Sequence, residues 1–343
     1  MMNFLRYLLF PFAVIFLLIT YIRNILFDYQ VIKSKSFSIP VIVVGNLSVG
    51  GTGKTPQIEY LIQLLKENYK VAVLSRGYKR KTKGFLLLDD THNAADVGDE
   101  PLQYFKKFSG IAVAVDENRA KGISLIVKYK TPEVVLLDDA FQHRKVQGSF
   151  YVLLTKYNDL FLDDFILPVG NLRESRAGAK RSDVIIVTKC PVNLSIEAQS
   201  RIKNRFSKYQ KEVFFTTIDY SETIHGEKTK TLNELTNFDI LLVTGIANSK
   251  PLEVFLSNKN IRYHHLKFSD HHHFSDSNIT TIQTNFETIQ SDNKLILTTE
   301  KDFVRLETKL NNLYYLPIKT AFLDENQQKQ FNEIINQHIK NSK

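Results

Sequence analysis

The sequence predicts an α/β fold made of a parallel sheet, a second and smaller α/β domain, and an N-terminal membrane-associated helix. Three observations lead to this prediction: an apolar N-terminal segment, short β-branched runs that alternate with amphipathic stretches, and a glycine-rich loop between a strand and a helix. Of the 343 residues, 43% are hydrophobic and 24% are charged. This composition excludes a disordered or fibrous chain, and the length favours two domains.

The N-terminal segment, residues 1–30, is mostly apolar. Sixteen uncharged residues lie between Arg6 and Arg23, and as a helix they reach roughly 24 Å, less than the ~30 Å of the bilayer hydrocarbon. A membrane anchor that spans or lies in one leaflet, a secretory signal peptide and a buried core helix are all compatible with such a run. Because no small-residue cleavage site follows Thr20, the signal peptide is disfavoured. We therefore expect a membrane-associated helix.

From residue 40 onward, short apolar runs alternate with amphipathic stretches, which is typical of βαβ units. Residues 31–220 are predicted to form a nucleotide-binding domain. Its expected strands are 41–44, 71–74, 85–88, 111–115, 134–137, 151–154, 184–187 and 213–217. The polar stretch 221–236 is predicted to be a linker or a ribbon, and 237–343 a smaller α/β domain. The expected elements there are strands 240–243, 261–266, 294–297 and 313–316 and a closing helix near 325–339.

The net charge of +9 is unevenly distributed along the chain. Residues 236–343 hold 12 basic and 12 acidic side chains, so the whole positive excess lies in residues 1–235. We expect an anionic partner to meet that part of the chain. The single cysteine, Cys190, excludes an intramolecular disulfide and a cysteine-based zinc site.

Four of the 14 glycines fall within residues 45–53, in the sequence VIVVGNLSVGGTGKTPQIEYL. An apolar strand, a glycine-rich loop and a helix starting near Lys54 bind nucleotide phosphates, because loop N–H groups and the helix N-terminus point at phosphate oxygens. Lys54 would reach the β- and γ-phosphates of ATP, and Thr55 would ligate Mg²⁺. Ser48 stands where the bare Walker pattern has glycine. The sequence thus predicts a P-loop NTPase-type sheet. The expected cofactor-binding residues are Gly50, Gly51, Thr52, Gly53, Lys54 and Thr55.

Two further groups of acidic residues are candidates for the site, one after a predicted strand and one before a predicted helix. Asp138 and Asp139 end an apolar strand, and we expect them to ligate Mg²⁺ beside the phosphate loop. Asp99 lies just before Pro101 and fits the N-cap of a helix over 102–108. The local sequence does not distinguish a helix cap from a general base at Asp99.

Histidines and basic residues are clustered. Five of the nine histidines lie in 264–273, but adjacent histidines without cysteine match no recognised zinc spacing. A single catalytic or carboxylate-orienting histidine within 270–274 is the favoured interpretation, and solvated loop histidines are the alternative. Two basic patches, 76–83 and 171–181, follow predicted strands. Such a patch indicates either a solvated face or a contact with a phosphate or an anionic headgroup.

With these motifs assembled, the chain resembles the tetraacyldisaccharide 4'-kinase family of Gram-negative bacteria over nearly its whole length. One departure is Ala140, where the family motif DDGFQHR has glycine. The matching motifs are Gly45-Asn46, Gly50 to Pro56, Ser75 to Tyr78, Gly98 to Pro101, Asp138-Asp139 with Phe141 to Arg144, Leu167-Pro168 with Gly170 and Leu172 to Glu174, Thr244 to Asn248, Asp270 to His272 and Thr299 to Asp302.

The resemblance implies an enzyme that uses ATP and Mg²⁺ to phosphorylate the 4'-hydroxyl of a tetraacyldisaccharide 1-phosphate, which yields lipid IV-A in lipid A biosynthesis. It implies that Asp99 and His271 form the pair that activates the hydroxyl, with Lys54 also catalytic. Because that pair is expected on opposite domains, domain closure would be a condition of the chemistry. Arg76 and Arg173 are expected to bind substrate.

The resemblance also implies a location at the cytoplasmic face of the inner membrane. The expected partners are an acylated glucosamine disaccharide phosphate lipid and an anionic membrane surface, with neither nucleic acid nor an obligate protein partner. Two other functions stay open: another P-loop kinase or ligase acting on a small metabolite, and a membrane-anchored, non-catalytic nucleotide switch. Thr188-Lys189 is similar to a guanine-reading site, but Pro191 replaces the expected Asp and disfavours GTP.

Overall fold

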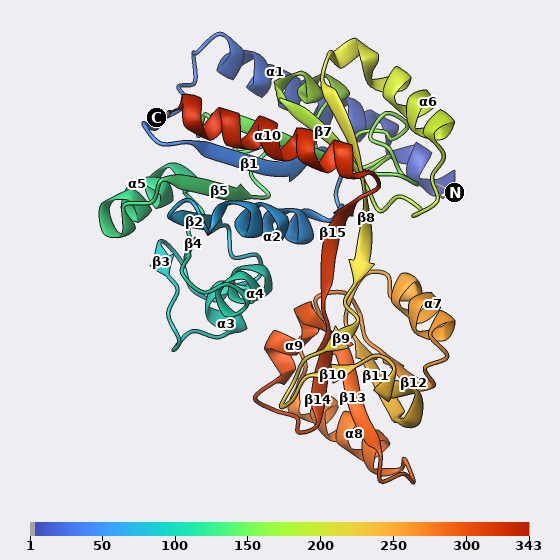
Figure 1. Cartoon of the computed structure of the whole chain (residues 1–343). Coiled ribbons are helices and arrows are strands. Elements are labelled where there is room, and N and C mark those ends of the chain that lie inside the picture. The colour runs from blue at the N-terminus through green and yellow to red at the C-terminus, as the bar shows by residue number, and fades with distance from the viewer. Residues whose placement is uncertain (1–3, 343) are drawn as a thin grey trace.

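The computed structural model of the protein describes residues 4–342 and contains two α/β units, with strands β8 and β15 running between them (Figure 1). The larger unit is built on a nine-stranded sheet in the order β15-β8-β7-β6-β1-β5-β2-β4-β3. Its strands are β1 (Val41–Asn46), β2 (Val71–Ser75), β3 (Leu86–Leu87), β4 (Ala112–Val115), β5 (Val134–Asp138), β6 (Phe150–Lys156), β7 (Val184–Thr188), β8 (Glu212–Tyr220) and β15 (Ile318–Phe322).

The central strands of this sheet are parallel, and the two edge strands, β3 and β15, pair antiparallel with their neighbours. Strands β1, β2, β5 and β7 are buried along their whole length, because helices cover both faces of the sheet. The helices of this unit are α2 (Lys54–Leu65), α3 (Ala94–Val97), α4 (Asp99–Lys107), α5 (Arg119–Lys130), α6 (Ile196–Phe206) and α10 (Glu325–Asn341), with 3₁₀ turns at Arg176–Arg181 and Ser207–Tyr209.

Helix α2 shows how the core is formed. Ile58, Leu61, Ile62 and Leu65 repeat at helical spacing and are fully buried against the sheet. At the end of β1, Gly45 permits a close approach of the next loop, since a Cβ there would lie 2.6 Å from the Cβ of Phe141. The phosphate loop and the loop after β5 are therefore held side by side.

The smaller unit contains a four-stranded parallel sheet in the order β12-β11-β13-β14. Its strands are β11 (Asp239–Thr244), β12 (Tyr263–Lys267), β13 (Lys294–Thr299) and β14 (Leu313–Leu316), and its helices are α7 (Lys250–Asn258), α8 (Asp276–Glu287) and α9 (Glu300–Leu306). Both sheets confirm the predicted fold class, and the expected strands are found within a few residues of their predicted limits.

The predicted division of the chain differs from the structure in two places. Residues 221–236 form a hairpin of β9 (Thr223–Ile224) and β10 (Lys230–Thr231) and a 3₁₀ turn (Glu234–Asn237). Ile224, Leu232 and Leu235 bury their side chains in the core of the smaller unit, so this stretch is part of that unit rather than a linker.

The second difference concerns the C-terminal part of the chain. Residues 318–341 were predicted to belong to the smaller domain, but β15 pairs with β8 and α10 packs on the large sheet (Figure 1). Phe331, Ile335 and Ile339 lie four residues apart and are fully buried in the core of the larger unit. The smaller unit is therefore an insertion between β8 and β15.

At the N-terminus, a 3₁₀ turn (Phe4–Leu9) leads into α1 (Phe10–Asp28). The stretch Arg6–Asp28 has 23 residues, and its most apolar 18 residues have a mean hydropathy of 2.0 with only 11% of them buried. At 1.5 Å per residue it reaches about 34 Å, which is longer than the apolar run alone and enough to cross a bilayer. Its exposed apolar side chains, such as Leu8, Phe12 and Ile19, argue against a buried core helix.

Candidate active site

The phosphate loop follows β1 and ends where α2 begins at Lys54. Gly53 takes a left-handed φ of 85°, which glycine adopts without strain. Asn46 holds the loop in shape by donating hydrogen bonds to the carbonyl of Ser48 at 2.6 Å and to the hydroxyl of Thr52 at 2.9 Å. Ser48 itself is buried and has an ordinary negative φ, so serine replaces glycine there without strain.

Two carboxylates lie at the end of β5, next to β1 and the phosphate loop. Asp138 is buried and accepts a hydrogen bond of 3.1 Å from the hydroxyl of Ser75. Burial and the neighbouring Asp139 raise the pKa of Asp138 to about 7. Burial also acts to raise the pKa of Asp139, but Lys54 at 3.6 Å and Arg173 at 3.0 Å outweigh it and lower that pKa. The pKa of Asp138 is therefore raised, whereas the pKa of its neighbour Asp139 is lowered.

Ala140, where the resembled family has glycine, is buried and has no positive φ, whereas Asp139 before it has a φ of 47°. The methyl group of Ala140 packs in the core beside the sheet. We therefore expect Ala140→Gly to lower the free energy of unfolding by about 1 kcal/mol, through lost burial and a more flexible unfolded chain. Urea unfolding and kcat measure this. A more stable variant, or a severalfold change in kcat, would mean that Ala140 strains the turn.

Asp99 begins helix α4, and Gly98 occupies the N-cap position. The interpretation of Asp99 as the N-cap is therefore wrong, because Gly98, with a φ of 91°, is the residue before the helix. The Asp99 carboxylate is almost fully buried and faces the smaller unit instead. Its Oδ2 lies 3.3 Å from Nδ1 of His271, and both carboxylate oxygens accept hydrogen bonds from the guanidinium of Arg305.

These contacts set the charge of Asp99. Burial acts to raise the pKa of Asp99, but the hydrogen bonds from His271 and Arg305 outweigh burial and lower it. On its other side, Nε2 of His271 lies 2.9 Å from the ammonium of Lys301. The ring of Tyr78 packs against His271 with the centroids 5.3 Å apart. Asp99 is therefore an ionised carboxylate held by groups from the other unit.

Two of the remaining clustered histidines have separate structural partners. His265 lies 2.9 Å from the hydroxyl of Thr244, and His272 lies 2.9 Å from Oδ1 of Asn278. Among residues 4–342, one group of three possible metal ligands was found, Asp99 with Glu100 and His271. Because Lys301 and Arg305 contact the same groups, positive charge is already present there.

Charged helices form the junction between the two units around Asp99. Lys107 of α4 lies 2.7 Å from Glu59 of α2 and 2.9 Å from Glu300 of α9. Burial and Glu300 raise the pKa of Glu59 to about 7. Lys106 forms a further ion pair with Glu307. Ion pairs therefore lie around Asp99, and those of Lys107 with Glu300 and of Lys106 with Glu307 join the two units.

The predicted substrate-binding arginines lie in different surroundings. Arg173 donates to Asp139 and to Gln142, so it is part of the acidic site. Arg76 is exposed, and its charge acts on His143 together with that of Arg119. Burial, followed by Arg119, Lys145 and Arg76, lowers the pKa of His143 to about 4. A group of positive charges therefore lies beside the two acids.

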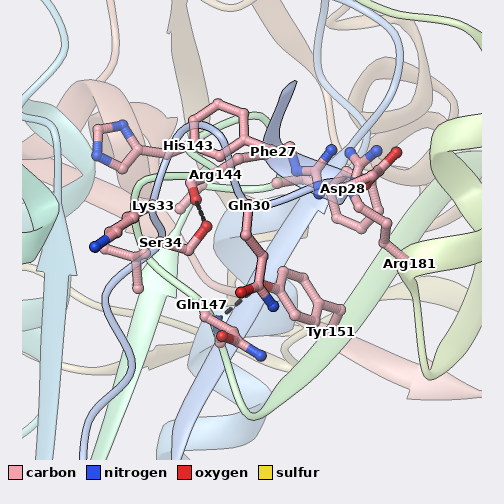
Figure 2. Close-up of a pocket in the computed structure, with 14 residues that line it drawn as sticks. Phe27, Asp28, Gln30, Lys33, Ser34, His143, Arg144, Gln147, Tyr151 and Arg181 are labelled. Atoms are coloured by element: carbon pink, nitrogen blue, oxygen red, sulfur yellow. Dashed lines mark hydrogen bonds and ion pairs between the residues drawn. The ribbon is translucent and has the colours of Figure 1, made fainter. Parts of the chain in front are cut away.

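A cavity of about 550 Å³ lies between the end of α1 and the loop after β5 (Figure 2). Lys33, Arg144 and Arg181 give it a positive lining, with Asp28 as an acidic member and His143 as a neutral one. Nε2 of His143 and Nε of Arg181 are buried without a hydrogen-bond partner within the described residues. The C-terminal end of the apolar helix and the loop after β5 therefore meet at a cationic surface.

Several residues of this site were not assigned by sequence reasoning. Arg305 received no role, and Lys301 appeared only as part of a motif. One signal was available: the two residues are four positions apart, directly after a predicted strand, and so lie on one helix face. Their contact with Asp99 and His271 depends on how the two units pack, which the sequence does not show.

The chain is similar over nearly its whole length to one family of enzymes. Residues 5–340 match the LpxK family, described as tetraacyldisaccharide-1-P 4'-kinase. The tetraacyldisaccharide 4'-kinase of Flavobacterium psychrophilum is 53% identical, and the match covers 99% of each chain. That of Bacteroides thetaiotaomicron is 45% identical, with 95% of this chain and 91% of the relative covered.

The structure is also similar to a solved one. The crystal structure of LpxK from Aquifex aeolicus in complex with ATP superimposes with a TM-score of 0.80 at 30% sequence identity. The match covers 98% of this chain and 99% of that chain. Both units of the fold described above are therefore shared with that protein.

Proposed function

The chain belongs to the tetraacyldisaccharide 4'-kinase family, and we propose that its reaction takes place at the junction of the two units. The enzyme is a kinase of lipid A biosynthesis that binds ATP. The acceptor is a lipid disaccharide, and the transferred group is the γ-phosphate. One observation supports this location most strongly: Asp99 of the larger unit contacts His271 of the smaller unit, and its neighbour Glu100 is near enough to Asp138 at the end of β5 to help raise the pKa of Asp138.

The phosphate loop binds the triphosphate of ATP in this proposal. Its backbone N–H groups and the N-terminus of α2 face phosphate oxygens. Lys54, whose side chain is 16% exposed and lies 3.6 Å from Asp139, supplies a positive charge to the β- and γ-phosphates. Phosphoryl transfer depends mainly on such positioning and charge neutralisation, so the loop holds the donor in line with the acceptor.

The residues present also fit a Mg²⁺ ion. Thr55, Asp138 and Asp139 offer the hard oxygen donors that Mg²⁺ prefers. Burial beside Asp139 disfavours the negative charge of Asp138, and a cation would relieve that cost. Asp139 already contacts Lys54 and Arg173, so we assign the closer role to Asp138. When bound, the ion would neutralise charge that develops on the phosphates.

Asp99 acts as the general base. Its ionised carboxylate takes the proton of the 4'-hydroxyl while the hydroxyl oxygen forms a bond to the γ-phosphorus. The bond from that phosphorus to the bridging oxygen breaks, and ADP leaves with the electron pair. His271 donates to Asp99 through Nδ1 and orients it. Because these two groups come from different units, the reaction requires the units to be closed on each other.

The group of positive charges beside the acids binds the phosphate of the lipid. Arg76 and Arg119 carry this charge, and together with burial they keep the neighbouring imidazole of His143 neutral at ordinary pH. An anionic phosphate would neutralise these charges, and guanidinium groups match its geometry. Arg173, bound to Asp139, positions the acid rather than the lipid in this proposal.

Helix α1 brings the site to the lipid bilayer. We place the enzyme at the cytoplasmic face of the inner membrane, where ATP is available and the apolar helix can insert. The cationic cavity of Figure 2 lies at the inner end of this helix, where anionic headgroups would be found. The lipid is then phosphorylated without leaving the membrane surface.

Charging the exposed face of α1 is expected to weaken membrane binding. Phe12 and Ile19 are 62% and 60% exposed, and each Asp introduced there costs about 2.5–3.5 kcal/mol in the bilayer. The Phe12→Asp/Ile19→Asp variant should therefore sediment poorly with vesicles that contain anionic lipid. Val192→Asp, at a residue 79% exposed on the larger unit, is the matched control and should bind as the wild type does. Unchanged binding of the double variant would contradict the anchor.

Transfer of labelled γ-phosphate to a tetraacyldisaccharide 1-phosphate in mixed micelles tests the proposed function. We expect label in the lipid with ATP and Mg²⁺, little label with GTP, and none after chelation of the metal. A small metabolite that is labelled while the lipid is not would support the soluble-kinase alternative. Nucleotide binding without any transfer would support the switch.

A further inference from the structure

Helix α9 presents two cations to the pair Asp99 and His271 across the junction. Lys301 and Arg305 are four residues apart, so they lie on the same face of the helix, one turn from each other. Both side chains are largely buried, with 24% and 15% of their surface exposed. The face of α9 that packs on α4 is therefore the face that reaches the base.

Arg305 binds Asp99 through two parallel hydrogen bonds. Nε donates to Oδ1 and Nη2 donates to Oδ2, while Nη1 donates to the backbone carbonyl of His272. Such bidentate contacts fix the carboxylate plane as well as neutralising its charge. The contact to His272 ties the same guanidinium to the loop that carries His271.

The contacts of Asp99 leave one of its acceptor positions for the hydroxyl of the lipid. An ionised carboxylate offers about four lone-pair positions, two on each oxygen. Arg305 occupies one on each oxygen, and His271 occupies a second one on Oδ2. The remaining position, on Oδ1, is the place for the hydroxyl proton. Arg305 and His271 together thus determine which lone pair of Asp99 faces the acceptor.

Lys301 determines which ring nitrogen of His271 carries the proton. An ammonium group donates hydrogen bonds and cannot accept them. Because the Lys301 ammonium lies 2.9 Å from Nε2 of His271, that nitrogen is the acceptor and the ring proton lies on Nδ1. Nδ1 is the atom that faces Oδ2 of Asp99 at 3.3 Å. The tautomer set by Lys301 is therefore the one that donates to the base.

From these contacts we propose that Lys301 and Arg305 are positioning residues of the phosphoryl transfer, with Arg305 orienting and ionising Asp99 and Lys301 fixing the tautomer of His271. This inference rests on the proposed role of Asp99 as base. Since both cations come from α9, the base reaches its reactive form only when the smaller unit is docked on α4.

The charges around Asp99 give the direction of the expected pH effect. His271 and Arg305 contact the carboxylate, Lys301 acts on it from the same helix as Arg305, and Glu100 follows it in α4. The cations lower the pKa of Asp99. Removing Arg305 therefore raises that pKa, so a higher pH is needed to ionise the base. The acid limb of the pH profile of kcat should move upward.

The test of Arg305 compares Arg305→Met and Arg305→Lys with the wild type. For Arg305→Met we expect kcat to fall by about tenfold or more. We also expect the acid limb of its pH profile to move up by about one pH unit. Arg305→Lys keeps the charge but not the two parallel bonds, so its limb should stay near the wild-type position while kcat falls. Arg262→Met, at an arginine 75% exposed on the same unit, is the matched control and should change neither quantity.

Two outcomes would overturn the role of Arg305. One is an Arg305→Met enzyme with wild-type kcat and pH profile. The other is a loss of kcat with an unmoved acid limb, because that is what a merely structural arginine would give. Thermal unfolding and the KM for ATP are measured alongside. If Arg305→Met fails to fold, the folded Arg305→Lys variant still decides, since unchanged kcat there contradicts the orienting role.

Lys301 is tested through its dependence on His271. We expect Lys301→Met to lower kcat by about tenfold in the wild type and to cause no further loss in a His271→Ala background. Equal losses in both backgrounds would overturn the assignment. Asp99→Asn separates this inference from the proposed function: an active Asp99→Asn enzyme would refute the base itself. An inactive one beside normal Arg305 and Lys301 variants would refute only the positioning roles.

Discussion

Lys54→Met is expected to abolish phosphoryl transfer and leave the fold intact. In the proposed site, the ammonium of Lys54 is the cation that the loop directs at the β- and γ-phosphates, and removing one preorganised donor of this kind costs on the order of 10²–10³ in kcat, or more. Stability should change little, because the side chain is outside the core and its acidic neighbour Asp139 keeps its contact with Arg173 at 3.0 Å. Radiolabel transfer and thermal unfolding measure the two effects.

A matched control for this substitution exists on the same helix. Lys66 follows the last residue of α2 and contacts Glu67 at 3.1 Å on the surface. Lys66→Met should keep full activity and full stability. A Lys54→Met enzyme with activity near that of Lys66→Met would show that the loop does not bind the transferred phosphate.

Asp99→Asn is the second substitution with a large expected effect. The amide has nearly the shape of the carboxylate but cannot accept the hydroxyl proton, so kcat should fall by about 10²–10⁴. ATP should still bind, since Asp99 lies in α4 and outside the phosphate loop. Turnover and equilibrium ATP binding are the measurements. The exposed Asp90→Asn is the control, and a kcat for Asp99→Asn close to that of this control would place the base elsewhere.

Features that depend on local sequence were predicted well. The strand, glycine-rich loop and helix around Lys54 form a continuous segment, and the strand before Asp138 is apolar along its whole length. Such strands are covered on both faces, so their composition alone identifies them. The large sheet and the nucleotide end of the site follow from these segments.

Features that depend on distant contacts were predicted poorly. Strand β15 pairs with β8, whose residues lie about a hundred positions earlier, and nothing in its five residues indicates that partner. Helix α10 is amphipathic and could have covered either sheet. The sequence therefore placed residues 318–341 in the wrong unit, although it identified the helix itself.

Contacts between distant segments also explain why the site could be predicted only in part. Asp99 was recognised as a residue of two possible roles, and only the packing of α9 on α4 brings His271 and Arg305 to it. Arg173 lies in a basic run that predicted either a solvated face or a phosphate contact, and in the structure it donates to Asp139. A run of charges does not show which group, if any, its members contact.

We propose that the reaction centre forms where Asp99 of one unit meets His271 of the other. The decisive test is a double-mutant cycle on kcat with Asp99→Ala, His271→Ala and the double variant. Each single variant should lose activity, and the double variant should lose much less than the product of the two losses. Fully multiplicative losses would contradict it, because they would mean that the two residues act independently.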